Sequence, residues 1–239
     1  MIPLQDLNPT RRWPLFTFGL IALNVLVFLW EQTLSADQLQ RAILDISVVP
    51  ANLTAAPFSL ESLLDSLRSM FLHGGWAHLG GNMLYLYLFG DNIEDRFGRL
   101  LYLLLYFASG FVAIFAQVII DPTSQIPLVG ASGAIAGVLG CYLVLFPGVR
   151  VRGIIPLGLF SRMADWPAWA VLALWFVLQL FNGLLSLGVE TGGGVAFFAH
   201  IGGFVAGAVL GWFFMRIVPQ PPADLRREML YERASRYRY

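Results

Sequence analysis

Six long stretches of this chain carry no charged side chain, and they constrain its fold more than any other feature. Each is close to or longer than the roughly 18–20 residues that an α-helix needs to cross the hydrocarbon core of a membrane. Backbone polar groups in lipid must pair within the protein, so we expect each stretch to be helical. The sequence, 57% hydrophobic and only 13% charged, predicts an all-α membrane protein, a single domain over 1–239 with six transmembrane helices. The expected helices lie at about 13–31, 77–92, 99–120, 131–147, 166–187 and 195–217.

The basic residues, which are all arginine, predict how these helices are oriented. In the six-helix arrangement, thirteen of the fifteen arginines fall on one side, and only Arg41 and Arg68 fall on the other. Connections rich in positive charge stay in the cytoplasm, so both termini are expected there. The basic tail over 218–239 is expected to lie in the cytoplasm beside anionic lipid headgroups, and we assign it no nucleic-acid partner.

The longest expected connection, over 33–74, joins the first two helices outside the cytoplasm. Apolar residues recur at helical spacing over 58–71, with charges on the opposite face, which predicts an amphipathic helix at the membrane interface. The stretch 46–60 is broken by two prolines and is expected to be loop. The glycine-rich segment 190–194, between the last two helices, is expected to be flexible.

Ionisable side chains are costly inside a bilayer, so each one in an apolar stretch is a candidate for function. The chain has three histidines, His73, His78 and His200. In the predicted topology, His78, Ser132 and His200 lie near the outer ends of the second, fourth and sixth helices. These three side chains are therefore expected at a similar depth, just below the outer surface. His73, at the mouth of the second helix, is interpreted as a capping or interfacial group.

Small residues recur at helical spacing on the fourth and sixth expected helices, which predicts that those two helices pack closely. The residues are Gly133, Gly137 and Gly140 on the fourth helix and Gly203, Gly207 and Gly211 on the sixth. Such packing would bring His200 within hydrogen-bond reach of Ser132. A serine hydroxyl becomes a good nucleophile when a neighbouring base takes its proton. Because no acid is placed nearby, the predicted constellation is a dyad, with Ser132 as nucleophile and His200 as general base.

His78 and Asn82 are four residues apart and share one face of the second expected helix. Both can donate hydrogen bonds, and acyl transfer requires donors aimed at the developing oxyanion. Simpler interpretations stay open from the residues alone, because serine and glycine often serve packing and a membrane histidine can bond to a neighbouring helix. Three histidines can also bind a metal ion, although the chain has no H-E-x-x-H motif.

Together these motifs resemble those of the rhomboid intramembrane serine proteases, in their six-helix form, over about residues 14–217. GASG at 130–133 resembles the motif around the nucleophile, which implies that role for Ser132. HLGGN at 78–82 resembles H-x-x-x-N, which implies that His78, Asn82 and the Ser132 backbone N–H bind the oxyanion. AHIGGFVAG at 199–207 resembles A-H-x-x-G-x-x-x-G, which implies His200 as the general base. EDRFG at 94–98 resembles a charged structural segment after the second helix.

The chain departs from the family pattern at Ala136, four residues after Ser132. Family members often carry an aromatic residue there, on which the catalytic histidine stacks. We therefore expect another residue, from the fifth helix, to orient His200.

The resemblance implies an enzyme that cleaves transmembrane protein substrates near the outer membrane face, with no metal ion or other cofactor. Family substrates tend to have small residues at the cut site and helix-destabilising residues nearby, since a peptide bond inside a helix is shielded. The fifth helix and 183–194 are expected to form the gate through which a substrate enters from lipid. The expected location is a bacterial inner membrane, and the oligomeric state is left open.

Two alternatives to a protease are considered. One is a rhomboid-like chaperone that binds membrane proteins without cutting them, although such a protein is expected to lack the serine or the histidine. The other is a transporter or channel, which is disfavoured because no ionisable residue lies deep in the cytoplasmic half of the expected helices.

Overall fold

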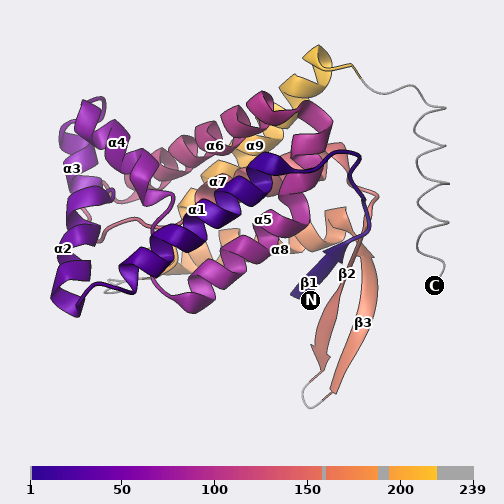
Figure 1. The fold of residues 1–239 in the computed structure, drawn as a ribbon, viewed down its shortest axis with the longest axis horizontal. Helices are drawn as coiled ribbons and strands as arrows, with labels where there is room; N and C mark the ends of the chain where they lie inside the picture. Colours follow the sequence, from indigo (N-terminus) through magenta and orange to yellow (C-terminus); the bar gives the residue numbers. More distant parts are fainter. Residues whose placement is uncertain (1, 158–159, 188–193, 220–239) are drawn as a thin grey trace.

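The computed structural model of this chain is mostly helical and describes residues 2–157, 160–187 and 194–219. Figure 1 shows a bundle of long helices, with short helices at one end and a small β-sheet at the other. The helices are α1 (Leu15–Glu31), α2 (Ala36–Ile46), α3 (Pro50–Ala55), α4 (Leu60–Ser69), α5 (Trp76–Phe97), α6 (Arg99–Ile120), α7 (Ser132–Leu145), α8 (Ala168–Ser186) and α9 (Phe197–Ile217). The strands are β1 (Ile2–Asp6), β2 (Arg150–Leu157) and β3 (Phe160–Pro167). We call the end with α2–α4 the loop end and the end with the strands the sheet end.

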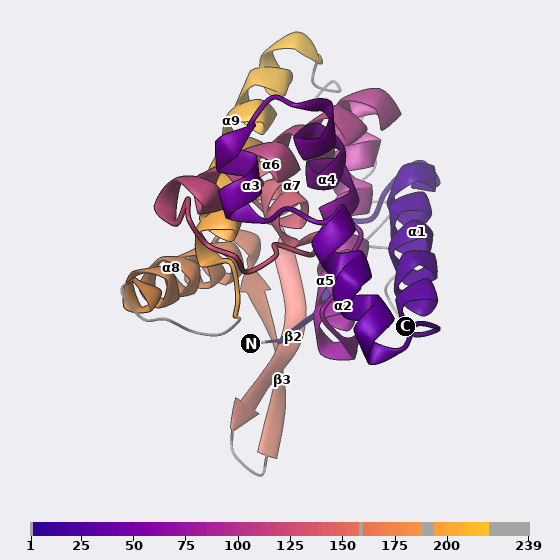
Figure 2. The same cartoon turned by 90° about the vertical axis from the view of Figure 1, so that its left-hand side faces the viewer.

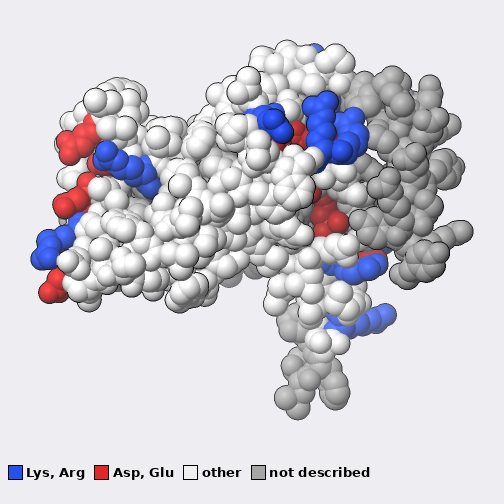
Figure 3. Space-filling view, viewed as in Figure 1, with Lys and Arg blue, Asp and Glu red and all other residues white. Residues whose placement is uncertain are grey.

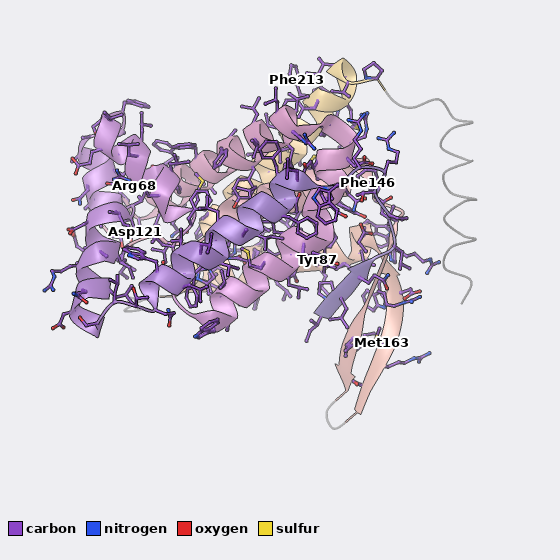
Figure 4. All side chains as sticks on the ribbon, viewed as in Figure 1. Arg68, Tyr87, Asp121, Phe146, Met163 and Phe213 are labelled. Carbon is purple, nitrogen blue, oxygen red and sulfur yellow. The ribbon has the colours of Figure 1, made fainter. Side chains whose placement is uncertain are left out.

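Charge separates the two ends from the middle of the molecule. On the face drawn in Figure 3, charged side chains gather at the loop end and the sheet end, and an uncharged band lies between them. Figure 4 locates the ends by single residues, with Arg68 and Asp121 at the loop end and Phe146 toward the opposite end. Among the described helices, α6, α8 and α9 are long and apolar enough to cross a membrane, and α1 and α7 are apolar but shorter. This distribution is typical of a protein that spans a bilayer along its long axis.

α7 is the central helix of the bundle. Figure 2, which views the molecule from the loop end, shows α7 between α1 and α5 on one side and α8 and α9 on the other. The residues of α7 from Gly133 to Tyr142 are all buried. A helix that is apolar on every face can be enclosed in this way, and its small residues let neighbouring helices approach.

α7 and α9 pack with their backbones in contact, as the glycine spacing predicts. A Cβ atom added to Gly203 would overlap the Gly133 carbonyl oxygen, and one added to Gly207 would overlap the Gly137 carbonyl oxygen. Backbones can approach this closely only where side chains are absent. The predicted contact is therefore confirmed, and it sets the start of α7 beside the first turns of α9.

At the sheet end, Glu94 of α5 caps the start of α1. Its carboxylate accepts hydrogen bonds from the Phe16 N–H (3.0 Å), the Thr17 N–H (2.8 Å) and the Thr17 hydroxyl (2.9 Å). The N–H groups of a first helical turn have no intrahelical acceptor, and α1 has no side-chain cap of its own. Negative charge at this position also interacts favourably with the helix dipole. The charged segment 94–98 thus joins α5 to α1.

A three-stranded antiparallel sheet, in the order β1-β2-β3, corrects the prediction of an all-α chain. β2 and β3 form a hairpin in the connection between α7 and α8, and β1 pairs with β2. Val151 is buried on one face of the sheet, whereas the neighbouring Arg152 makes two hydrogen bonds to the Asp165 carboxylate, at 2.8 and 3.0 Å. Alternation of buried and charged residues is the period-two pattern of a strand. β3 runs to Pro167, so α8 begins at Ala168 rather than at the expected 166.

The connection at the loop end contains three short helices. α4 lies within the predicted amphipathic stretch 58–71, and the Ser59 hydroxyl caps it by accepting the Ser62 N–H at 3.1 Å. The prediction of loop over 46–60 is wrong at α3, which begins with Pro50, because proline suits the first turn of a helix.

Two further expectations concern segment ends. α5 continues to Phe97, beyond its expected end near 92. Most of the glycine-rich segment 190–194 and almost all of the basic tail lie outside the described residues.

Candidate active site

A cavity of about 1460 Å³ lies at the loop end of the bundle. Its walls include His78 and Asn82 of α5, Ser132 of α7 and His200 of α9. The four candidate side chains therefore line one space, although they come from three helices. Ala136, the position of the departure from the family pattern, lies in the same wall.

Ser132 is the first residue of α7 and follows a tight turn that requires glycine. Gly130 has a φ of +124°, and a Cβ atom added there would lie 2.8 Å from His78 Nε2. The Gly130 N–H donates to the Ser69 carbonyl oxygen at 2.8 Å, which ties the turn to the end of α4. The N–H groups of the first turn of α7 have no intrahelical acceptor. They are therefore available to a negatively charged oxygen beside Ser132.

His78 and Asn82 present donors toward the same turn. The Gly74 N–H donates to His78 Nδ1 at 3.3 Å, so Nδ1 is the acceptor and the ring proton is on Nε2. Asn82 Nδ2 is buried, has no hydrogen-bond partner in the described part of the chain, and lies 3.7 Å from the Cβ position of Gly130. Two side-chain donors that converge in front of Ser132 can stabilise an oxyanion.

His200 is oriented by two residues of α8. Its Nδ1 lies 2.8 Å from Gln179 Oε1, so the Nδ1–H donates and Nε2 carries no proton. The ring of Trp175, one turn earlier, has its centroid 5.8 Å from that of His200 at an interplanar angle of 34°. Both contacts come from the fifth long helix, from which the sequence analysis expected a residue to orient His200. A neutral imidazole with a free Nε2 can accept the proton of a serine hydroxyl.

The structure leaves the serine and the histidine unlinked. Ser132 and His200 line the same cavity, and the hydrogen bond described for the His200 ring is the one to Gln179. Bonds between a nucleophile and its base are often long in unliganded enzymes and tighten in the substrate complex. The cavity also reaches Leu187 and Gly194, which flank the undescribed segment 188–193, so the expected gate over 183–194 lies partly outside the described residues.

Gln117 of α6 holds the first turn of α9 and thereby places His200. Its Oε1 accepts the Phe198 N–H at 3.1 Å and the Ala199 N–H at 3.3 Å. Gln117 and Gln179 are neutral, so ionisable residues alone do not point to them. Both are polar side chains within apolar helices, and such side chains often bond to neighbouring helices.

His73 lies behind the cavity wall and is buried rather than interfacial. Its backbone N–H donates to Glu31 Oε1 at 3.1 Å, and its side chain is 3% exposed. Burial and the neighbouring His78 lower the pKa of His73 to about 4, so this ring is neutral at physiological pH. Among the residues that the structure describes, no three His, Cys, Asp or Glu side chains are placed to hold a metal ion.

A family model described as the Rhomboid domain matches residues 61–217, which include all four candidate residues of the cavity. The chain belongs to the rhomboid family. It is accordingly a multi-pass membrane protein, and the matched residues include the helices α5–α9 that surround the cavity.

Several rhomboids of known name are similar to this one. Rhomboid protein 1, mitochondrial, from Saccharomyces cerevisiae is 27% identical over 84% of this chain and 54% of its own length. RHOMBOID-like protein 4 from Arabidopsis thaliana is 34% identical over 62% of this chain and 33% of its own length. Rhomboid protease AarA from Providencia stuartii is 29% identical over 81% of this chain and 70% of its own length. The chain thus spans about half of the yeast relative and a third of the Arabidopsis relative.

Proposed function

We propose that this rhomboid is an intramembrane serine endopeptidase that uses Ser132 and His200 as a catalytic dyad. The observation that carries the proposal is the cavity in which Ser132, a histidine with a free Nε2 and two convergent donors meet. Relatives that are named as proteases, such as Rhomboid protease AarA, support the same reaction class.

The proposed reaction follows from the hydrogen bonds around the cavity. Ser132 Oγ attacks the substrate carbonyl carbon while its proton passes to His200 Nε2. The developing oxyanion accepts hydrogen bonds from His78 Nε2–H, Asn82 Nδ2–H and the Ser132 backbone N–H. His200 then gives its proton to the leaving amine, and water releases the acyl group from Ser132.

Gln179 takes the orienting position that an aspartate occupies in a Ser-His-Asp triad. The Gln179 amide oxygen accepts the Nδ1–H of His200 and holds the ring in the tautomer that the reaction requires. Because Gln179 is neutral, it supplies no full negative charge to the imidazolium that forms on His200. Its contribution to the dyad is therefore to orient the His200 ring rather than to form a buried ion pair.

We further propose that α1 and α5–α9 cross the membrane, with both termini in the cytoplasm and the loop end outside. The thirteen-to-two division of the arginines supports this orientation. It sets the cavity near the outer face, where transmembrane substrates would be cut after local unwinding, preferentially beside small residues. We propose a bacterial inner membrane as its location, which the similarity to the Providencia stuartii protein supports.

The experiment compares the purified wild-type protein with the Ser132→Ala variant in liposomes that contain a generic transmembrane substrate. We expect the wild type to release two fragments and the variant to release none, while both have the same melting temperature. Cleavage by Ser132→Ala at the wild-type rate would overturn the proposal. Substrate binding without cleavage by the wild type would instead favour a rhomboid-like chaperone.

A further inference from the structure

Glu31, the last residue of α1, is a buried carboxylate outside the cavity wall. It is 1% exposed, its Oε1 accepts the His73 N–H at 3.1 Å, and its Oε2 has no partner in the described part of the chain. Burying an ionised carboxylate costs several kcal/mol, and one backbone hydrogen bond offsets only part of that cost. Stability therefore does not account for a glutamate at this position.

The turn that Glu31 holds leads directly to the candidate oxyanion site. The His73 ring donates from Nδ1 to the Phe71 carbonyl oxygen at 3.2 Å, so both its backbone and its side chain are fixed. The Phe28 ring, on the last turns of α1, makes edge contacts with His73 at 6.5 Å and with Trp76 at 4.9 Å between centroids. α1 thus holds residues 71–76 through one carboxylate and one aromatic ring.

The next residue of the turn sets the tautomer of His78. The Gly74 N–H is the donor to His78 Nδ1. Were this N–H turned away, His78 Nδ1 would lose its only described donor, and the ring proton would no longer be confined to Nε2. The His73 ring packs against His78 with centroids 5.1 Å apart, which limits rotation of the His78 ring.

We propose that Glu31 is a positioning residue, which acts through the His73–Gly74 backbone to keep the His78 Nε2–H aimed at the oxyanion. The proposal rests on the proposed function, because it assigns Glu31 to the donor side of that reaction. It requires an acceptor that reaches from α1 to the His73 N–H, and it does not require a charge. The Glu31→Gln substitution should therefore preserve the role, whereas the side chain introduced by Glu31→Asp would be too short.

A second buried carboxylate provides the matched control. Glu94 is 4% exposed and also accepts backbone N–H groups, but it does so at the sheet end, far from His78. Its removal is expected to lower stability without any link to His78. Comparing variants of Glu31 with variants of Glu94 therefore distinguishes a positioning role from a purely structural one.

The experiment is a double-mutant cycle in liposomes with the same transmembrane substrate. We measure kcat, KM and melting temperature for the wild type, Glu31→Ala, His78→Ala and the double variant. We expect Glu31→Ala to lower kcat about tenfold with KM nearly unchanged, and His78→Ala to lower it roughly 100-fold, as for loss of one oxyanion donor. The double variant should stay within about twofold of His78→Ala alone, because coupled residues are not additive.

The controls use two conservative variants and the distant carboxylate. Glu31→Gln should keep kcat within about threefold of the wild type, and Glu31→Asp should lose as much as Glu31→Ala. Because these two differ little from the native side chain, they decide the question even if Glu31→Ala fails to fold. Glu94→Ala should combine additively with His78→Ala.

A further tenfold loss of kcat in the double variant, or an Asp variant as active as the Gln variant, would overturn the positioning role. Either result would leave the proposed function intact so long as Ser132→Ala is inactive. Cleavage that persists in Ser132→Ala would instead overturn the proposed function, and the role of Glu31 with it.

Discussion

At the sheet end, Glu94 accepts three hydrogen bonds from the start of α1, whereas at the loop end the buried Asn82 Nδ2 donates none among the described residues. A buried donor without a partner costs roughly 1–3 kcal/mol of stability. Such groups are rare in native proteins, and each requires an explanation. The comparison is between a carboxylate that joins two helices and a buried donor that, under the proposed function, is available to an oxygen atom of the substrate.

The largest difference between the two ends is expected at Asn82. If Asn82 donates chiefly to the transition state, Asn82→Ala should lower kcat roughly 10²–10³-fold, equivalent to about 2.7–4 kcal/mol, and change KM little. The melting temperature should stay close to the wild-type value, because Nδ2 makes no described hydrogen bond to lose. Steady-state kinetics and thermal melts on one preparation test this. A normal kcat with a lower melting temperature would make Asn82 a structural residue.

A smaller effect is expected at Gln179, which orients His200. Gln179→Leu removes the acceptor of the His200 Nδ1–H and should lower kcat by about tenfold, a part of the contribution of a general base. Gln179→Glu keeps an acceptor at the same reach and should stay within about threefold of the wild type. Equal kcat values for the Leu variant and the wild type would show that Trp175 alone orients His200.

The smallest effect on cleavage is expected at the sheet end, where Asp6 is one of several side chains with a buried atom that has no partner among the described residues. Asp6 Oδ2 accepts the Asn92 side chain at 2.7 Å, whereas Oδ1 has no partner in the described part of the chain. Burial, with a contribution from the Asp91 carboxylate, raises the pKa of Asp6 to about 8. The unfolded chain releases this proton near pH 4, so the folded state loses stability as pH rises from about 4 to about 8.

Asp6→Asn keeps the acceptor for Asn92 and removes the titration. Its melting temperature should match the wild type near pH 4 and exceed it at pH 8.5, by about 2–4 °C for each kcal/mol of stability that the wild type loses. The cleavage rate should be unchanged, because Asp6 lies at the opposite end of the molecule from the cavity. If the melting temperatures of the two proteins change with pH in the same way, Asp6 is not buried as a neutral acid.

Patterns of single residue types in the sequence predicted that a few polar side chains from separate helices lie at a similar depth. Most of each long helix falls in a charge-free stretch, although α5 continues through the charged segment to Phe97. The glycine spacing on 133–137 and 203–207 identified the helix pair whose backbones touch. Ser132, His78, Asn82 and His200 line one cavity, and their roles stay predictions.

The residues that the sequence did not identify act through partners that only the tertiary structure brings together. Gln179 and Gln117 are neutral residues in apolar stretches, so their meaning depends on the neighbouring helix. Glu31 ends an apolar stretch, a place where a charged residue normally marks the edge of a membrane span. It is buried because the turn at His73 packs against the end of α1. The sheet was missed because the alternation at 150–152 is short and its partner strands are distant in sequence or separated by the hairpin turn.

Covalent labelling tests the central claim, that Ser132 is a nucleophile activated by His200, most directly. The purified protein in liposomes is treated with a fluorophosphonate probe, and the modified peptide is identified by mass spectrometry. We predict a single adduct on Ser132 that is lost in His200→Ala and slowed, but retained, in Asn82→Ala. An adduct on another residue, or undiminished labelling of Ser132 in His200→Ala, would contradict the account.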